Sequence, residues 1–198
     1  MGKDSPIAAV VAICDESRGI GKDGHLPWPY LREDHDFYMG LCKTTKDPAK
    51  KNGIIMGRNG WRKWKHKQNP KMAVVVTSQS VPLDEPNCLG VARTFDEAIE
   101  MLQSGPRADE IESIFILGGR RNYEHSVSDP RCTTLYLTRV FRDFECDIFF
   151  PEYNHAFKKI SHPEIQDHIH KDLTNDIEFR FEVHEKISSE QSVSTSGI

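Results

Sequence analysis

The chain has 198 residues, of which 37% are hydrophobic and 28% are charged, and this is the composition of an ordinary globular protein. Its formal net charge is −4 and its sequence pI is near 6.1, so we do not expect nucleic acid as its main partner. It contains no run of about 18 apolar residues and no segment of signal-peptide type, so we expect a cytoplasmic protein without a membrane partner.

The cysteines and histidines give no metal-binding pattern. Five cysteines are an odd number, and none of them forms a Cys-x-x-Cys pair, which fits reduced thiols better than disulfides or a zinc site. The nine histidines lack His-Glu-x-x-His spacing, so we expect no metal. We expect the chain to be a monomer that acts on a small molecule.

Short apolar runs alternate with helical patterns along most of the chain. The apolar runs predict strands at 7–14, 53–56, 72–77, 114–117 and 134–140. The helical patterns cover 31–43, 95–103 and 120–127. Thr94 and Glu97 form a capping box before the second helix. Residues 179–183 alternate with a period of two, which predicts a half-exposed antiparallel strand at the end of the sheet.

This order of elements predicts an α/β fold. Strands that alternate with helices form a mostly parallel central sheet with helices on both faces, here with an antiparallel C-terminal strand. We expect residues 1–187 to be a single domain. Residues 188–198 are rich in serine and lack a core pattern, so we expect a disordered tail there.

The segment 19–24 reads Gly-Ile-Gly-Lys-Asp-Gly and matches the G-x-G-x-x-G pattern of dinucleotide-binding folds. That pattern requires a helix to open at the third glycine. Pro27 and Pro29 follow instead, and they exclude a helix interior. We therefore interpret the segment as part of a long mobile loop between the first strand and the first helix.

A second glycine pair, Gly118 and Gly119, lies between an apolar run and a helical pattern. Glycines at the end of a strand let backbone N–H groups approach a ligand. The start of the helix adds free donors and the positive end of a dipole, which suit phosphate, and Arg120 and Arg121 add charge. The alternative is a plain strand-to-helix turn.

Asp34 falls on an apolar stripe of the first predicted helix, with Leu31, Tyr38 and Leu41. A carboxylate on a face that packs on the core must be paired, neutralised or functional. The alternative is that Asp34 lies at the edge of the stripe and only favours the first turn of the helix.

A set of short segments has a distinctive order and spacing. It comprises 10–12 (Val-Val-Ala), 19–28 (Gly-Ile-Gly-Lys-Asp-Gly-His-Leu-Pro-Trp), 55–58 (Ile-Met-Gly-Arg), 116–119 (Ile-Leu-Gly-Gly), 137–139 (Leu-Thr-Arg), 143–147 (Asp-Phe-Glu-Cys-Asp) and 150–152 (Phe-Pro-Glu). In this set the chain resembles the dihydrofolate reductase family over roughly residues 7–187. The loop at 19–28 is the most specific match.

The resemblance implies a dihydrofolate-reductase-like fold in which NADPH and dihydrofolate meet. Ala12 and the loop 20–26 would contact the nicotinamide, and Gly118, Gly119 and the helix start would hold the pyrophosphate. Arg58, Thr77 and Arg93 would lie near the adenosine phosphates. The full implied cofactor set is Ala12, Ile20, Gly21, Lys22, Asp23, Gly24, His25, Leu26, Gly57, Arg58, Asn59, Gly60, Thr77, Ser78, Gln79, Arg93, Gly118, Gly119, Arg120, Arg121, Asn122 and Tyr123.

The resemblance also assigns a catalytic group. Asp34 would grip the pterin through its 2-amino group and ring nitrogen, with Thr138 supporting it and Trp28 helping to hold a water molecule. A desolvated carboxylate has a raised pKa and can relay a proton toward N5, while hydride passes to C6. The implied substrate contacts are Val10, Val11, Leu26, Asp34, His35, Tyr38, Trp64, Lys71, Leu117 and Tyr123.

The chain departs from the family pattern in the folate half of the site. Gly60 stands where the family usually has threonine, Trp64 falls where an Ile-Pro pair is usual, and His35 replaces an aromatic or apolar residue. Lys71 stands where the family has an arginine that forks onto the glutamate tail, and an ammonium cannot offer two parallel donors.

Three functions remain open from the residues. The chain is either a working dihydrofolate reductase, or a divergent paralogue that keeps the fold, with or without NADPH binding, but is non-catalytic or acts on another pterin. A reductase of a riboflavin precursor is the third. The Leu-Pro-Trp loop and Asp34 favour pterins.

Overall fold

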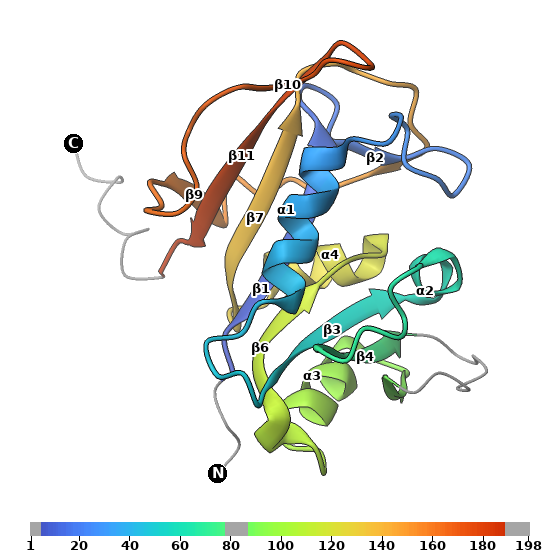
Figure 1. Cartoon of the computed structure of the whole chain (residues 1–198), viewed down its shortest axis with the longest axis vertical. Helices are drawn as coiled ribbons and strands as arrows, with labels where there is room; N and C mark the ends of the chain where they lie inside the picture. Colours follow the sequence, from blue (N-terminus) through green and yellow to red (C-terminus); the bar gives the residue numbers. More distant parts are fainter. Residues whose placement is uncertain (1–4, 78–86, 189–198) are drawn as a thin grey trace.

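The computed structural model describes residues 5–77 and 87–188. In this part of the chain one twisted sheet forms the centre of the molecule (Figure 1). Its strands are β1 (Ile7–Cys14), β3 (Lys51–Gly57), β4 (Met72–Thr77), β5 (Cys88–Ala92), β6 (Ile111–Ile116), β7 (Cys132–Val140), β9 (Phe157–Ile160), β10 (His170–Asp172) and β11 (Ile177–Lys186). They follow the order β10-β11-β7-β1-β6-β3-β4-β5, and β9 also pairs with β11.

The sheet is mostly parallel, as the sequence predicts. β1 runs parallel to β6 and β7, and β3 runs parallel to β4 and β6. β11 runs antiparallel to β7. The carboxyl ends of the parallel strands therefore lie along one edge of the sheet, which is where open α/β sheets bind their ligands.

Helices cover both faces of the sheet, which confirms the prediction. The helical elements are α1 (Arg32–Lys43), α2 (Arg58–Lys63), α3 (Phe95–Gln103), the short 3₁₀ helix η1 (Ala108–Glu110) and α4 (Arg120–Ser128). Side chains of α1 and α2 pack in one apolar cluster with β1, β3 and β4, whereas α3 and α4 pack in another on the opposite face. In Figure 1, α1 crosses in front of the strands.

The start of α3 shows how local sequence sets an element. Thr94 Oγ1 accepts a hydrogen bond from the Glu97 N–H at 3.1 Å, as in a capping box. The Glu97 carboxylate reaches one residue further back than expected and accepts from the Arg93 N–H at 2.7 Å. Both bonds satisfy N–H groups at the start of the helix.

The expectation for the C-terminal strand is wrong in two respects. β11 is not at the end of the sheet, because β10 pairs with its outer side over His170–Asp172. It is also not half-exposed throughout, since Glu182 and His184 are buried. β9 covers this half of β11, so polar positions that would face water in an edge strand lie inside.

The segment between β1 and α1 is more ordered than a plain loop. β2 (Gly19–Gly21) pairs antiparallel with β8 (Ile148–Phe149). Lys22 and His25 close a tight turn through two backbone hydrogen bonds of 2.9 Å. Its central residues, Asp23 and Gly24, both have positive φ, which is the geometry that Asp-Gly favours in two-residue hairpins.

The structure describes only part of what the sequence predicts for the C-terminal tail and for membrane spans. The expected tail at 188–198 lies outside them from residue 189 onward. Within the described residues, no helix is long and apolar enough to cross a membrane.

Candidate active site

Asp34 lies in the first turn of α1, at the edge of the sheet where the parallel strands end. The Thr138 hydroxyl donates a hydrogen bond to its carboxylate, but burial dominates and raises the pKa of Asp34 to about 6. The carboxyl group therefore changes its charge close to neutral pH. This outcome favours a functional Asp34 over a residue that only supports the helix start.

Thr138 is placed by strand pairing. It lies two residues before the end of β7, opposite Ala12 of β1 and Phe181 of β11, and its exposed fraction is 3%. A hydroxyl in the centre of a sheet has a fixed direction, so Thr138 can hold the Asp34 carboxylate in one orientation. The structure thus brings together two of the three predicted catalytic residues.

Trp28, the third, is 4% exposed and packs in the apolar cluster that contains Leu31 and Val140, with Ala12 at its margin. Its ring lies edge-on to Phe144 at 6.2 Å. Among the described residues, the buried Nε1 of Trp28 has no hydrogen-bond partner. A buried indole N–H requires an acceptor, so this atom suits a bound water molecule.

Two neighbouring valines of β1 face opposite sides of the sheet. Val10 packs in the cluster under α1, the face on which Asp34 lies, whereas Val11 packs in the cluster of α3 and α4. Because side chains alternate along a strand, Val11 can meet a ligand beside Asp34 only through its backbone. The predicted substrate contact of Val11 therefore stays a prediction that only its backbone can meet.

The other predicted substrate contacts are spread around α1. Tyr38, Trp64 and Leu117 pack at the margin of the cluster beneath this helix. Burial raises the pKa of Tyr38 to about 12. Leu26 is 61% exposed and does not contribute to the buried part of the site.

His35 is part of an aromatic group rather than a lone side chain. Its ring contacts Tyr30 and Tyr38, and its Nε2 hydrogen-bonds Nε2 of His66 at 3.1 Å. Burial and the nearby His35 lower the pKa of His66. His35 thus links α1 to the segment after α2, a contact that the sequence did not predict.

Lys71 does not occupy the position expected of a carboxylate-binding residue. Its ammonium donates to the Pro48 carbonyl at 2.5 Å and lies 3.4 Å from the Lys50 carbonyl. These carbonyls belong to the connection between α1 and β3. The side chain therefore braces this connection, and the predicted contact of Lys71 with the substrate stays a prediction.

Gly118 and Gly119 form the turn between β6 and α4, and the peptide bond between them is cis. Gly119 caps α4 without a side-chain bond, and the helix leaves the N–H groups of its first turn without partners inside it. A Cβ built on Gly119 would meet no described atom within 4 Å, whereas one on Gly57 would lie 2.9 Å from the Gly119 nitrogen. The turn is thus tightly packed on the side of β3 and open in front of the helix.

Asn122 and Thr77 fix this turn from behind. Asn122 Nδ2 donates to the Gly118 carbonyl at 2.6 Å and to Thr77 Oγ1 at 2.9 Å. The hydroxyl of Tyr123 donates to the Val10 carbonyl at 2.8 Å, so the Tyr123 side chain is already engaged in the core. These three predicted residues support the site from within the protein.

The charged residues predicted near the phosphates lie at the surface. Arg58, Arg93, Arg120 and Arg121 are exposed, and Arg120 also forms a 2.8 Å ion pair with Glu124. Asn59 and Gly60 are exposed in α2. Ser78 and Gln79 lie outside the described residues.

Lys63 contacts the loop 20–26, a contact that no sequence pattern indicates. Its Nζ donates to the Gly24 carbonyl at 2.5 Å and lies 3.2 Å from Nε2 of His25. Lys63 is the last residue of α2. It therefore links the tight turn at residues 22–25, which follows β2 and is called the β2 hairpin below, to the helix that begins at Arg58. The predicted members Ile20 to His25 thus stand beside the α2 side of the site.

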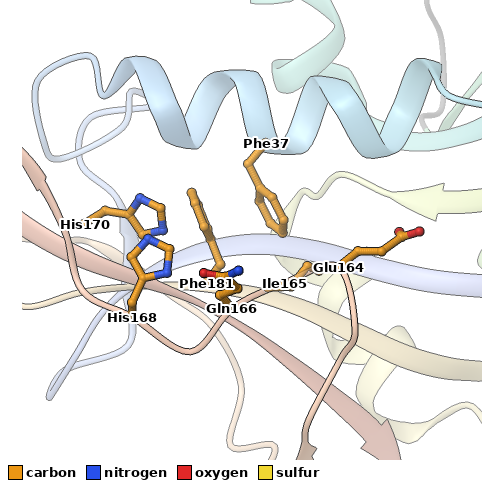
Figure 2. A pocket seen from close by; sticks show the side chains of 7 residues that line it. All are labelled: Phe37, Glu164, Ile165, Gln166, His168, His170 and Phe181. Carbon is orange, nitrogen blue, oxygen red and sulfur yellow. The ribbon is translucent and has the colours of Figure 1, made fainter.

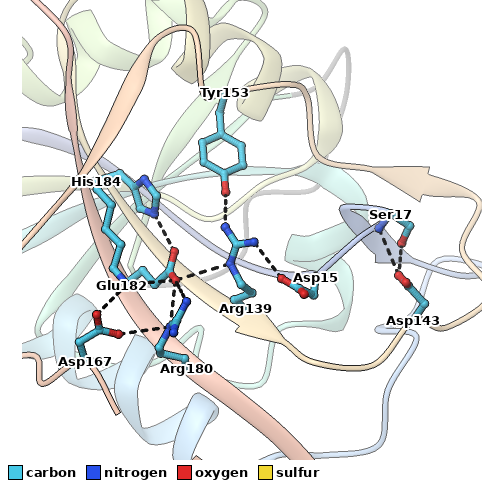
Figure 3. A network of polar contacts seen from close by, with 10 residues as sticks. Asp15, Ser17, Arg139, Asp143, Tyr153, Asp167, Arg180, Glu182 and His184 are labelled. Carbon is cyan, nitrogen blue, oxygen red and sulfur yellow. Dashed lines mark hydrogen bonds and ion pairs between the residues drawn. The ribbon is translucent and has the colours of Figure 1, made fainter. Parts of the chain in front are cut away.

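The buried carboxylate of Glu182, on β11, joins a network of polar contacts with neighbouring strands (Figure 3). Burial alone would raise the pKa of Glu182, but the hydrogen bond from His184 and the charge of Arg139 bring it down to about 2. Arg139 also donates to Asp15 at 2.8 Å and to the Tyr153 hydroxyl at 3.0 Å. This network fixes the β7 strand next to Thr138 against the end of β1.

A pocket of about 310 Å³ lies between α1 and β11 (Figure 2). It is lined by Phe37, Glu164, Ile165, Gln166, His168, His170 and Phe181. None of these is a predicted site residue, although Phe181 pairs with Thr138 across β11 and β7. Within the described residues, no cluster of three or more histidine, cysteine or acidic side chains could hold a metal ion.

Comparisons with known proteins agree with the geometry. The model of the family described as dihydrofolate reductase matches residues 7–186. Among curated proteins, dihydrofolate reductase of Rattus norvegicus is 30% identical over 185 residues, covering 91% of this chain and 97% of the relative. That of Aedes albopictus is 31% identical over 183 residues, covering 90% and 96%.

A solved structure supports the fold. Schistosoma mansoni dihydrofolate reductase aligns with a TM-score of 0.78 and 23% sequence identity, over 91% of this chain and 98% of that one. At this identity the likeness supports the arrangement of the elements, while the family follows from the sequence matches.

Proposed function

The chain belongs to the dihydrofolate reductase family, and from this premise we infer that it is an NADP-dependent oxidoreductase that reduces 7,8-dihydrofolate to tetrahydrofolate. The observation that carries the mechanism is the pairing of Asp34 with Thr138, in which burial raises the pKa of the acid to about 6. We propose that this carboxyl group binds the pterin and controls its protonation.

The residues at the β6–α4 turn fit the dinucleotide. The space in front of Gly119 is open, and the first turn of α4 presents N–H groups with the positive end of the helix dipole behind them, which suits a pyrophosphate. Arg120 and Arg121 add positive charge at the same turn. Arg58 is the guanidinium that we assign to the 2′-phosphate, with Arg93 as the second candidate.

When NADPH is bound, it supplies the hydride that C6 of the pterin accepts. The protein positions the two rings and excludes water between them. Ala12 and Thr138 face each other across β1 and β7, so the floor beside Asp34 is rigid. The Ile20–His25 hairpin and Trp28 are suited to cover the ring on the other side.

Asp34 has two tasks. Ionised, its two oxygens accept hydrogen bonds from the 2-amino group and a ring nitrogen of the pterin. Protonated, it is a proton source for N5, and a pKa near 6 keeps a substantial protonated fraction close to neutral pH. Because Thr138 holds the carboxyl in one orientation, proton delivery and substrate binding use the same geometry.

The other two readings of the sequence have no observation in their favour. A non-catalytic paralogue would not need an acid whose burial raises its pKa to about 6. A reductase of a riboflavin precursor is not supported by the family match.

We also propose that the protein works as a monomer in a reducing cytoplasm, on a small molecule and without a nucleic acid or membrane partner. None of the five cysteines forms a disulfide bond, and Cys88 and Cys146 are partly exposed, which fits a reducing compartment.

The activity is tested by following NADPH oxidation spectrophotometrically with dihydrofolate, beside dihydrobiopterin and a control without substrate. We expect turnover with dihydrofolate that is lost in Asp34→Asn while NADPH still binds. Oxidation of NADPH with dihydrobiopterin alone would contradict the assigned substrate.

A further inference from the structure

Two cysteines that are far apart in the sequence meet beside the β2 hairpin. The sulfur atoms of Cys14 and Cys146 are 4.0 Å apart, although 132 positions separate the residues. Cys14 ends β1 and is fully buried, whereas Cys146 is partly exposed and precedes β8. The pair therefore joins the central strand of the sheet to the segment that supports the active-site loop.

The surroundings of Cys146 hold its sulfur in place. A Cβ built on Gly19 would lie 2.3 Å from the Cys146 sulfur, so only glycine at this position leaves room for the thiol. The next residue, Asp147, donates its N–H to the Gly21 carbonyl at 2.9 Å, and its carboxylate accepts from the Asp23 N–H at 2.8 Å. Cys146 thus packs against Gly19 at the start of β2, and the hydrogen bonds of the next residue hold its segment against the rest of β2 and the turn that follows.

A disulfide bond has a sulfur–sulfur distance near 2.05 Å, so these two atoms need to approach by about 2 Å. A displacement of this size is what a change of side-chain rotamer produces at a cysteine sulfur. We propose that Cys14 and Cys146 are an oxidative modification site, at which the two thiols form a reversible intramolecular disulfide with a low-molecular-weight disulfide as the oxidant.

The chemistry proceeds by two exchanges. Cys146, the more accessible thiol, loses its proton and attacks the oxidant, which forms a mixed disulfide and releases one thiolate. Cys14 then loses its proton and attacks the Cys146 sulfur, which releases the second thiolate. The protein loses two protons and two electrons, and the oxidant is reduced to two thiols.

Formation of the disulfide between Cys14 and Cys146 is slow at neutral pH. Burial and the adjacent Cys14 raise the pKa of Cys146 to about 11, so the reactive thiolate is scarce. Below that pKa the thiolate fraction rises about tenfold for each step of one in pH, and the rate of cross-linking should follow it. This dependence distinguishes Cys146 from an exposed thiol, whose rate levels off near its ordinary pKa.

The bond would tie the segment before β8 to the end of β1. This segment carries Phe144, which packs against Trp28, and Asp143, which accepts hydrogen bonds from the backbone and hydroxyl of Ser17 at 3.2 and 2.6 Å. Oxidation therefore adds a covalent link to contacts that already hold the active-site loop. A disulfide between Cys14 and Cys146 closes a long loop of the chain, and this should raise Tm by roughly 5–15 °C.

The experiment uses the full chain with oxidised glutathione at mildly alkaline pH. Free thiols are alkylated without reduction, and the digest is analysed by mass spectrometry. We expect two of the five thiols to disappear, a peptide pair linked through Cys14 and Cys146, a higher Tm, and reversal of all three by dithiothreitol.

Single substitutions supply the controls. Cys146→Ser should give neither link nor shift in Tm, whereas Cys14→Ser should retain glutathione on Cys146. Cys88→Ser is the matched control, because Cys88 is also partly exposed, and it should cross-link as the unaltered chain does. A link through any other pair, five alkylatable thiols after oxidation, or a linked protein with unchanged Tm would overturn the proposal.

Discussion

Replacing Asp34 by asparagine should change stability and turnover with opposite signs. Burial raises the pKa of Asp34 from 3.8 to about 6, so the folded state holds this proton more tightly than the unfolded state does. The stability associated with the protonated acid is fully present below pH 4 and is lost as the pH rises through about 6. Asparagine carries no charge and escapes this loss.

The size of the effect follows from the two pKa values. At 1.36 kcal/mol for each step of one in pKa, their difference corresponds to about 3 kcal/mol. Because Asp34 retains some exposure in the site, we expect about 1–3 kcal/mol in practice. The difference in unfolding free energy between Asp34→Asn and the unaltered chain should therefore be constant below about pH 4. Between pH 4 and about pH 7 it should change steadily in favour of Asp34→Asn.

The assay is urea denaturation of both proteins at several pH values, with the difference in unfolding free energy plotted against pH. Thr138→Val is the companion variant, since it removes the one hydrogen bond that favours the charged form and should move the midpoint of the difference curve upward. In the unaltered enzyme the hydride step should slow as the pH rises through about 6, because protonated Asp34 is the proton source. A pH-independent difference in stability would refute the assigned burial, and an unchanged turnover in Asp34→Asn would refute the catalytic role.

Three further outcomes test the cofactor side of the site. NADPH should raise Tm more than NADH does, and Arg58→Ala should bring the two shifts together by weakening NADPH binding about tenfold; equal shifts in the unaltered chain would exclude a guanidinium at the 2′-phosphate. Gly57→Ala should destabilise the fold by about 1–3 kcal/mol in thermal or urea unfolding, because its Cβ would lie 2.9 Å from the Gly119 nitrogen; an unaffected variant would mean that this approach is not tight. Lys63→Met should raise the KM for NADPH a few-fold at nearly constant stability, since it releases the Gly24 carbonyl; unchanged kinetics would show that the tie does not order the loop.

The long helices and strands could be predicted because each of their residue patterns is compatible with only one type of secondary structure. The strand at Met72–Thr77 and the helix at Phe95–Gln103 have the predicted bounds, since a short β-branched run and a capped amphipathic run leave few alternatives. The stripe on α1 is only partly confirmed: Leu31 is buried and Tyr38 packs at the margin of the cluster beneath the helix, but the buried residues of α1 are Met39 and Cys42. An acid on such a stripe was the one site residue that periodicity alone could single out.

The features that escaped the sequence depend on partners far away in the chain. β2 and β8 are too short to leave a pattern, although Asp23-Gly24 is a hairpin signal that the sequence alone contains. The burial of Glu182 requires β9 and cations from three strands. Lys71 shows the same limit, because a sequence gives the position of an ammonium but not the carbonyl toward which its flexible stem turns.

The two faces of β1 explain why residue-by-residue transfer from a family needs a structure. An apolar run that is buried on both sides has no polar residue to mark which face is which, so Val10 and Val11 looked equivalent as substrate contacts. The register with β7 separates them: Ala12 pairs with Thr138, and alternation then places Val10 with Ala12 on the face of Asp34 and Val11 on the other. A cross-strand pair that includes one catalytic residue is therefore enough to orient the whole strand, and the same pairing places Cys14, two residues after Ala12, on the side where Cys146 meets it.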